Sequence, residues 1–255
     1  MQNKKVLITG GGRGIGRAIA ISFAKQGFDI SIVAKTKSEI NSVADEIRSL
    51  GVNAIAKVCD VTSSVKVEKI FGEIEREMGR IDIFVANAGM LLKNELILTD
   101  DNLWNQIMDV NLNSVFYTTR SVIKGMIKRK SGRVIVISSV SGKLGGAFRS
   151  AYHAAKHGAI GFVKSIALEV AEHDITVNAI CPGFVETKMM KDNQELFTDA
   201  ESDSIDIVQN LKNDIPMKRF LDPVEVASMS VYLASDSASG ITGQAYTISC
   251  GAVQI

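Results

Sequence analysis

The sequence has almost no excess of charge of either sign. Its 255 residues carry 29 lysines and arginines against 28 aspartates and glutamates, a formal net charge of +1. A basic surface of the kind that attracts nucleic acid or an anionic membrane is therefore not expected. We expect a protein that binds neither nucleic acid nor a membrane.

Long hydrophobic runs are also missing. The amino-terminal segment MQNKKVLITGG reaches its glycines after a short apolar run, too short for the apolar region of a signal peptide. No later stretch approaches the roughly 18 consecutive apolar residues of a membrane-spanning helix. We expect a cytoplasmic protein.

Cysteine and histidine are scarce, with three residues of each. Cys59, Cys181 and Cys250 are far apart and have no CxxC spacing, which is typical of buried thiols in a reducing compartment. His153 and His157 form an i, i+4 pair, but no acidic or cysteine partner stands at ligand spacing nearby. We predict no metal site.

No linker rich in proline, glycine or serine divides the chain, so we predict one domain over residues 1–255. Short runs of β-branched and apolar residues alternate with longer segments of helical period. The predicted strands are 5–9, 28–34, 52–59, 81–88, 133–139 and 174–180. The predicted helices are 14–26, 37–50, 64–78, 102–129 and 151–172. Apolar strands alternating with amphipathic helices indicate an α/β fold: a Rossmann-like, doubly wound parallel sheet with helices on both faces.

Two helix starts have capping patterns. Thr36 and Glu39 match a capping box before the helix at 37–50, and Asp222-Pro223-Val224-Glu225 has the same pattern with a proline at the first helical position. The region 184–221 departs from the alternation of strands and helices, is acidic, and contains Met189, Met190, Phe197 and Phe220. We predict that this region forms a substrate loop or lid.

A glycine-rich turn, TGGGRGIG at residues 9–16, joins the first strand to the first helix. The spacing is Gly10-x-x-x-Gly14-x-Gly16, and GxGxxG fails in every register. Between a strand and a helix, such glycines let a pyrophosphate approach the backbone and the helix N-terminus. We predict a dinucleotide site that includes Gly10, Gly12, Arg13, Gly14, Ile15 and Gly16; a plain βα turn is the alternative.

The end of the second predicted strand indicates which dinucleotide binds. An acidic residue there would hydrogen-bond a ribose 2′-hydroxyl, whereas a basic residue accommodates a 2′-phosphate. The segment Val33-Ala34-Lys35-Thr36-Lys37 has no carboxylate, and Arg13 adds a second cation to Lys35. We therefore predict NADP(H) in preference to NAD(H); a solvated loop is the alternative reading of Lys35 and Lys37.

Ordered motifs along nearly the whole chain resemble the short-chain dehydrogenase/reductase family. They are TGGGRGIG, Asp60-Val61, ANAG at 86–89, Asn111 in DVNL, Ser139 in ISSVSG, Tyr152-x-x-x-Lys156, and CPGFVET at 181–187. The resemblance implies an enzyme that transfers a hydride between a nicotinamide ring and a carbonyl carbon. One departure is Ala86, where the family usually has a first asparagine; we expect a hydrogen bond of the central sheet to be missing.

The resemblance assigns catalytic roles to Asn111, Ser139, Tyr152 and Lys156. Tyr152 and Lys156 share a helix face, and an ammonium near the phenol is expected to lower the tyrosine pKa toward neutrality. Lys156 would also hold the nicotinamide ribose, Ser139 would bind the substrate oxygen beside Tyr152, and Asn111 would bind a water that links Lys156 to solvent.

The resemblance also assigns further cofactor contacts. Asp60 and Val61 would contact the adenine, Asn87 the region near its ribose, and Val185 and Thr187 the nicotinamide side. A homotetramer is implied as well, packed through the helices at 102–129 and 151–172 and the carboxyl-terminal segment.

The motif texture is most similar to 3-oxoacyl thioester reductases and polyketide ketoreductases. The basic cluster of Lys128, Arg129, Lys130 and Arg133 could meet an acidic acyl carrier protein, or simply match a helix dipole. Glu172-His173-Asp174 argues against carrier binding. FRSAYHAAKHG is also similar to hydroxybutyrate dehydrogenases. An NAD(P)-dependent dehydrogenase of a small hydroxy acid, sugar or steroid alcohol therefore stays open, as does a non-catalytic nucleotide-binding regulator.

Overall fold

A computed structural model of the protein describes residues 4–192 and 204–255, and in these ranges it contains a seven-stranded sheet. The strands are β1 (Lys5–Thr9), β2 (Asp29–Ala34), β3 (Ala54–Val58), β4 (Ile83–Ala86), β5 (Gly132–Ile137), β6 (Ile175–Pro182) and β7 (Ala245–Ile248). Their order is β3-β2-β1-β4-β5-β6-β7, and all neighbours are parallel. The predicted α/β fold is confirmed.

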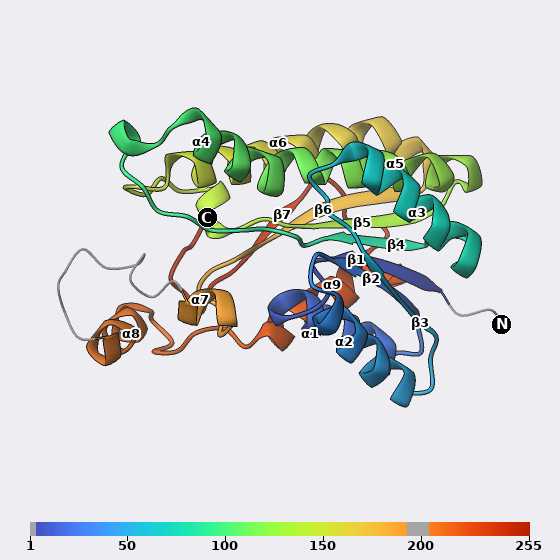
Figure 1. The fold of residues 1–255 in the computed structure, drawn as a ribbon, viewed down its shortest axis with the longest axis horizontal. Coiled ribbons are helices and arrows are strands. Elements are labelled where there is room, and N and C mark those ends of the chain that lie inside the picture. Colours follow the sequence, from blue (N-terminus) through green and yellow to red (C-terminus); the bar gives the residue numbers. More distant parts are fainter. Residues whose placement is uncertain (1–3, 193–203) are drawn as a thin grey trace.

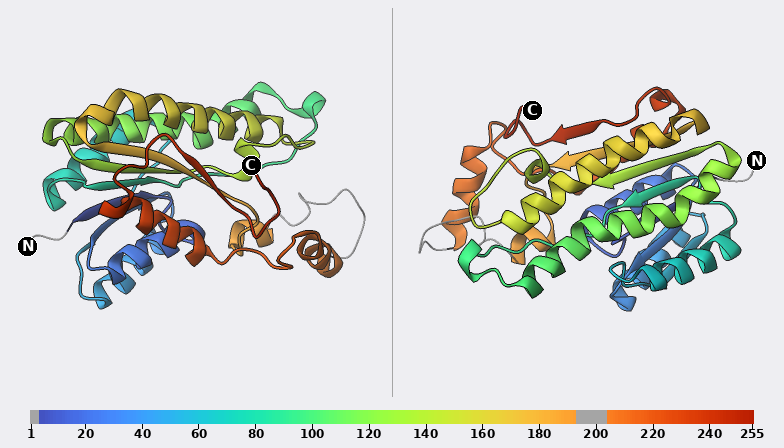
Figure 2. Two further views of the ribbon diagram at one scale, coloured as in Figure 1. Left: turned by 180° about the vertical axis from the view of Figure 1, so that it is seen from behind. Right: turned by 90° about the horizontal axis from the view of Figure 1, so that it is seen from above.

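Helices cover both faces of the sheet (Figures 1 and 2). On one face lie α1 (Gly14–Lys25), α2 (Lys37–Ser49) and α9 (Pro223–Ala234). On the other lie α3 (Ser64–Met78), α5 (Ser114–Arg129) and α6 (Ser150–Val170), with α4 (Asp101–Met108) at their end. Short 3₁₀ turns are η1 (Leu96–Leu98), η3 (Val140–Gly142), η4 (Ala171–His173) and η6 (Asp236–Ala238).

The two helical layers explain why the strands are apolar throughout. In β1, Val6 and Ile8 enter the core under α1 and α9, while Leu7 enters the core under α3 and α5. Ile135 and Val136 of β5 divide in the same way. Because successive strand residues point to opposite faces, a sheet covered on both sides needs apolar residues at every position.

The predicted helix at 102–129 is interrupted. Its two parts, α4 and α5, are joined by one π-helical turn, η2 (Asp109–Asn113), which contains Asn111. Such turns are frequent at functional sites. The last strand, β7, was not predicted, since its four half-buried residues give a weak pattern.

Only one of the two predicted capping boxes forms. Before α9, Asp222 accepts from the Val224 N–H at 2.8 Å and Glu225 accepts from the Asp222 N–H at 2.8 Å. At α2, Thr36 occupies the cap position but accepts no capping hydrogen bond. The capping box predicted at Thr36 is therefore wrong, and Glu39 contacts Arg13 instead, with Oε1 3.5 Å from Arg13 Nη1.

The ends of the central strands are tied together at the carboxyl edge of the sheet. The backbone N–H groups of Asn87 and Ala88 both donate to Thr9 Oγ1 at 3.0 Å. Asn87 Nδ2 donates to the carbonyls of Thr9 at 3.0 Å and Gly10 at 3.2 Å. Despite Ala86, Thr9 and Asn87 therefore hold β1 to β4, where the strand order reverses.

The region predicted as a lid lies beyond this edge. Val185 forms a β-bridge with Leu221, and α7 (Lys188–Asp192) and α8 (Ser204–Asp214) lie between these two residues in the chain (Figure 1). Met190 and Phe220 are buried in the core under α1 and α9. Phe197, also predicted in this region, lies outside the described residues.

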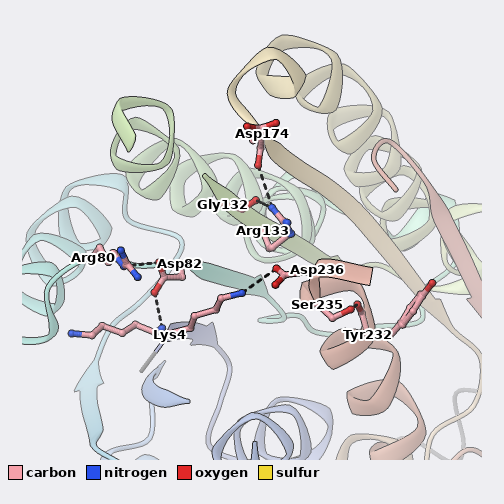
Figure 3. A network of polar contacts seen from close by, with 10 residues as sticks. Lys4, Arg80, Asp82, Gly132, Arg133, Asp174, Tyr232, Ser235 and Asp236 are labelled. Carbon is pink, nitrogen blue, oxygen red and sulfur yellow. Dashed lines mark hydrogen bonds and ion pairs between the residues drawn. The ribbon is translucent and has the colours of Figure 1, made fainter. Parts of the chain in front are cut away.

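The opposite, amino edge of the sheet has a network of polar contacts (Figure 3). Arg133 donates to the carbonyls of Gly132 at 2.9 Å and Asp174 at 3.2 Å, and Arg129 donates to the carbonyl of Ile81. These two arginines of the basic cluster therefore bind backbone carbonyl groups near the starts of β4, β5 and β6. The predicted contact of this cluster with an acyl carrier protein stays a prediction.

Candidate active site

A cavity of about 690 Å³ lies at the carboxyl edge of the strands. It starts at the turn after β1 and extends past the ends of β2, β4 and β5 to α6 and α7. Ligands of doubly wound sheets bind at this edge, where the strand order reverses. Of the predicted site residues, those that line it are Gly10, Gly12, Arg13, Gly14, Ile15, Gly16, Lys35, Val61, Asn87, Asn111, Tyr152, Lys156 and Thr187.

The turn after β1 requires glycine at two kinds of position. Gly10 and Gly14 have φ of 64° and 53°, which side chains other than glycine rarely adopt. At Gly16 a Cβ atom would lie 2.2 Å from the carbonyl oxygen of Gly10. The glycines of the turn line the cavity beside the N-terminus of α1, the kind of position where a pyrophosphate binds. The turn therefore fits a dinucleotide.

The end of the cavity near β2 carries two cations and two carboxylates. Lys35 Nζ lies 3.1 Å from Asp60 Oδ2, and Arg13 Nη1 lies 3.5 Å from Glu39 Oε1. Glu39 and Thr36 line the cavity with the cations. Glu39 was not predicted at this site because its position in the first turn of α2 is that of a capping glutamate.

Asp60 is not among the residues that line the cavity. Its Oδ1 accepts from the Thr62 N–H at 3.1 Å and from the Thr62 hydroxyl at 2.7 Å. Burial raises the pKa of Asp60, but the hydrogen bonds from Thr62 and Lys35 outweigh it and leave this pKa below its ordinary value. Val61 and Thr62 line the cavity instead of Asp60.

Tyr152 and Lys156 lie one turn apart on α6 and both line the cavity. Lys156 Nζ is 5.7 Å from the centroid of the Tyr152 ring and donates to the carbonyl of Ile137 at 3.1 Å. Ser139 lies beside the Tyr152 phenol and affects its pKa, and Ser139 Oγ accepts a hydrogen bond from the Ser141 N–H at 3.1 Å. A hydroxyl pair and an ammonium group thus converge at the end of β5.

The expected lowering of the Tyr152 pKa is wrong for the free protein. Burial raises the pKa of Tyr152, and the hydrogen bond with Ser139 and the charge of Arg149 reduce this rise only in part. Burial also lowers the pKa of Lys156 to about 8. Desolvation disfavours the charged form of both groups, so the phenol keeps its proton at neutral pH.

Asn111 is fully buried in the π turn. Its Nδ2 donates to the carbonyls of Met90 and Ile107, both at 3.0 Å, and its Oδ1 accepts from the Met90 N–H at 3.2 Å. A Cβ atom at Gly89 would lie 3.1 Å from Asn111 Oδ1 and 3.5 Å from Lys156 Nζ. Gly89 therefore leaves room for Asn111 and Lys156 to approach each other.

Three predicted residues lie outside the cavity wall, Asp60, Ser139 and Val185. Val185 is buried in its bridge to Leu221. Other lining residues were not predicted, among them Glu39, Met90, Ser138 and the α4 residues Asn102, Asn105 and Gln106. The i, i+3, i+4 spacing on α4 could have revealed the last group.

Among the described residues, no group of three or more His, Cys, Asp or Glu side chains could hold a metal ion. Cys59, Cys181 and Cys250 are free and buried. None of the helices described at 4–192 and 204–255 is both long and apolar enough to cross a membrane.

Comparisons with known proteins agree with this geometry. The family model described as short chain dehydrogenase matches residues 4–196. The chain is 39% identical over 250 residues to the 3-oxoacyl-acyl-carrier-protein reductase FabG of Salmonella typhimurium, covering 98% of this chain and 97% of that protein.

Two solved structures superpose closely on this chain. A variant of actinorhodin polyketide ketoreductase, solved with NADPH, has a TM-score of 0.96 at 34% identity, covering 98% of this chain and 97% of the other. Levodione reductase has a TM-score of 0.93 at 30% identity, covering 97% and 96% of the two chains.

Proposed function

Because the chain belongs to the short-chain dehydrogenase family, we propose that it is an NADPH-dependent oxidoreductase that reduces a ketone to a secondary alcohol. The substrate class that we propose is a 3-oxoacyl thioester. The proposal depends above all on Tyr152 and Lys156, which both line the cavity that begins at the glycine turn, with Ser139 beside the Tyr152 phenol.

Different residues of the cavity would hold different parts of the dinucleotide. The glycine turn and the N-terminus of α1 would bind the pyrophosphate, and Arg13 and Lys35 would bind the 2′-phosphate. Val61 would contact the adenine, and Lys156 would bind the nicotinamide ribose. When bound, the dinucleotide supplies the hydride for the carbonyl carbon.

The hydroxyl group of Tyr152 supplies the proton, and the hydroxyl group of Ser139 positions the substrate. Ser139 hydrogen-bonds the substrate oxygen and places it against Tyr152 Oη, which gives its proton to that oxygen as the alcohol forms. A raised pKa suits this direction, since a ketone reduction needs the protonated phenol. Lys156 then returns a proton to Tyr152 from solvent.

The side chain of Asn111 is occupied by hydrogen bonds with the backbone of neighbouring segments. Both of its side-chain N–H groups bind the carbonyls of Met90 and Ile107. We therefore assign the predicted water contact to the backbone carbonyl of Asn111, in the π turn, and give its side chain the role of holding the loop after β4.

The names of the relatives support the thioester, because a 3-oxoacyl-acyl-carrier-protein reductase is 39% identical to this chain. The second candidate is an NAD(P)-dependent dehydrogenase of a small hydroxy acid, sugar or steroid alcohol. Glu39 favours it, because a carboxylate at the adenosine end suits an unphosphorylated ribose.

We also propose that the protein forms a homotetramer. Phe116 of α5 is 41% exposed and packs edge-on against Phe162 of α6, with ring centroids 6.3 Å apart. An apolar surface shared by these two helices supports packing of a homotetramer, and light scattering on the purified protein tests it.

A purified-protein assay tests the reaction. The rates of NADPH and NADH oxidation are measured separately with acetoacetyl-CoA, then with a panel of ketones. A rate with NADPH well above that with NADH supports the thioester reductase. Activity with NADH alone contradicts the cofactor assignment and favours the second candidate.

A further inference from the structure

Glu39 places a carboxylate where the adenosine ribose of the dinucleotide would lie. We propose that Glu39 is a specificity-determining residue: it competes with the 2′-phosphate of NADPH for Arg13, and it offers an acceptor to the ribose hydroxyl of NADH. This inference rests on the proposed dinucleotide site and adds that binding is balanced between the two cofactors by one side chain.

The position of Glu39 follows from local structure. Its place in the first turn of α2 is that of the capping glutamate, yet Thr36 accepts no capping hydrogen bond. Glu39 instead extends to the glycine turn, with Oε1 3.5 Å from Arg13 Nη1. A Cβ atom at Gly12 would lie 3.0 Å from Glu39 Cβ and 3.4 Å from Oε2, so the absence of a side chain at Gly12 admits the carboxylate.

Charge at this end of the cavity is compensated. Arg13 pairs with Glu39 and Lys35 pairs with Asp60, so each cation that suits a phosphate already has an anionic partner. The two carboxylates differ, however. Asp60 is held by Thr62 and lies outside the cavity wall, whereas Glu39 lines the cavity and is only half-buried.

An incoming 2′-phosphate would therefore meet Glu39 directly. Like charges a few ångströms apart repel, and the phosphate must also replace Glu39 as the partner of Arg13. An unphosphorylated ribose meets the opposite situation, because an acidic side chain accepts hydrogen bonds from its hydroxyls. The same carboxylate thus weakens NADPH binding and strengthens NADH binding.

The test is a set of dissociation constants for NADPH and NADH, measured by the fluorescence of the bound nicotinamide. Glu39→Gln keeps the size of the side chain and removes its charge. We expect it to tighten NADPH binding about tenfold, the effect of one close charge pair at a partly exposed site, and to weaken NADH binding.

A matched control is available on the same two helices. Glu46 of α2 pairs with Arg17 of α1 at 2.6 Å, outside the cavity, so Glu46→Gln should change neither dissociation constant. In an Arg13→Gln background, the gain in NADPH affinity from Glu39→Gln should shrink, because the contested cation is gone.

The outcomes separate the two claims. If the wild-type protein binds neither dinucleotide, the proposed function fails. If it binds them but Glu39→Gln leaves the ratio of the two constants unchanged, or changes it no more than Glu46→Gln does, the role of Glu39 is wrong and the proposed function stands.

Discussion

The ammonium nitrogen of Lys156 lies 5.7 Å from the centroid of the Tyr152 ring, one turn away on α6; Lys156 is buried and Tyr152 is half-buried. Burial acts on these two groups in opposite directions. It raises the pKa of Tyr152 and lowers the pKa of Lys156, so each is held closer to its neutral form than in water. The buried charge of Lys156 is therefore unfavourable in the free protein, and a bound ligand can compensate it.

Because the charge of Lys156 is buried, we expect replacement of Lys156 to stabilise the fold while it abolishes activity. Because its pKa is about 8 in the folded protein, against an ordinary value of 10.5, the cost of burying the charge is present at pH 7. Lys156→Met should increase the free energy of unfolding at pH 7 by up to about 3 kcal/mol while abolishing turnover. Urea denaturation without cofactor measures the first effect.

The pH dependence of the wild-type protein gives a second readout. Its folded state loses the Lys156 proton at about pH 8, before the unfolded state does, so stability should rise between pH 8 and pH 10. The Met variant should lack this rise. A Met variant that is less stable at pH 7 would show that the Lys156 charge is not a net cost.

The glycine turn predicts a paired result for two Gly→Ala variants. At Gly16 the new Cβ would meet the Gly10 carbonyl at 2.2 Å, so the turn must shift. Gly161, in α6, has nothing within 4 Å, and alanine there should stabilise the helix by up to about 1 kcal/mol. Gly16→Ala should lose dinucleotide binding, measured by calorimetry, and Gly161→Ala should keep it. Equal binding by both variants would contradict the assigned pyrophosphate site.

The contrast between the two predicted caps is testable by thermal unfolding. Asp222 accepts a hydrogen bond from the Val224 N–H, so Asp222→Ala should cost about 1 kcal/mol. Thr36 accepts none, and Thr36→Ala should cost much less. A larger loss for Thr36→Ala would mean that the capping box at α2 does form in solution.

Because His153 is buried, we expect the protein to lose stability in acid. It is buried on α6, its Nδ1 contacts the Leu144 carbonyl, and Arg149 and His157 lie nearby. Burial lowers the pKa of His153 below its ordinary value of 6.5, with the charges of Arg149 and His157 acting in the same direction. The unfolded state therefore binds the proton first, and stability should fall as pH drops below about 6.5.

His153→Asn removes the titrating ring and keeps a donor for Leu144. The free energy of unfolding of this variant should change less between pH 7 and pH 5 than that of the wild type. The same acid-induced loss in both proteins would place its origin in other groups.

Most of the fold could be predicted from the sequence. Helices expected at 14–26 and 64–78 are observed at Gly14–Lys25 and Ser64–Met78, because long periodic segments leave little choice of face. The strand β7 was missed, since four half-buried residues at a sheet edge do not form a distinctive run. The division of 102–129 by a π turn has no simple sequence signal.

The site was predictable where it depends on local spacing. Tyr152 and Lys156 are one helical turn apart, and the turn at 9–16 follows a strand directly, so both were predictable from the sequence. Glu39 was misassigned because its partner, Arg13, lies 26 residues away in the chain. The direction of the Tyr152 pKa was mistaken for a similar reason: it depends on burial by the whole fold.

The role of Tyr152 as proton donor is tested by comparing wild-type protein with Tyr152→Phe. Turnover of acetoacetyl-CoA with NADPH and the dissociation constant for NADPH are measured on both. Loss of the Tyr152 proton donor should lower kcat by at least about a hundredfold and leave the dissociation constant nearly unchanged. Equal turnover in the two proteins would contradict the assigned chemistry, and no turnover with any ketone in either would indicate a nucleotide-binding regulator instead.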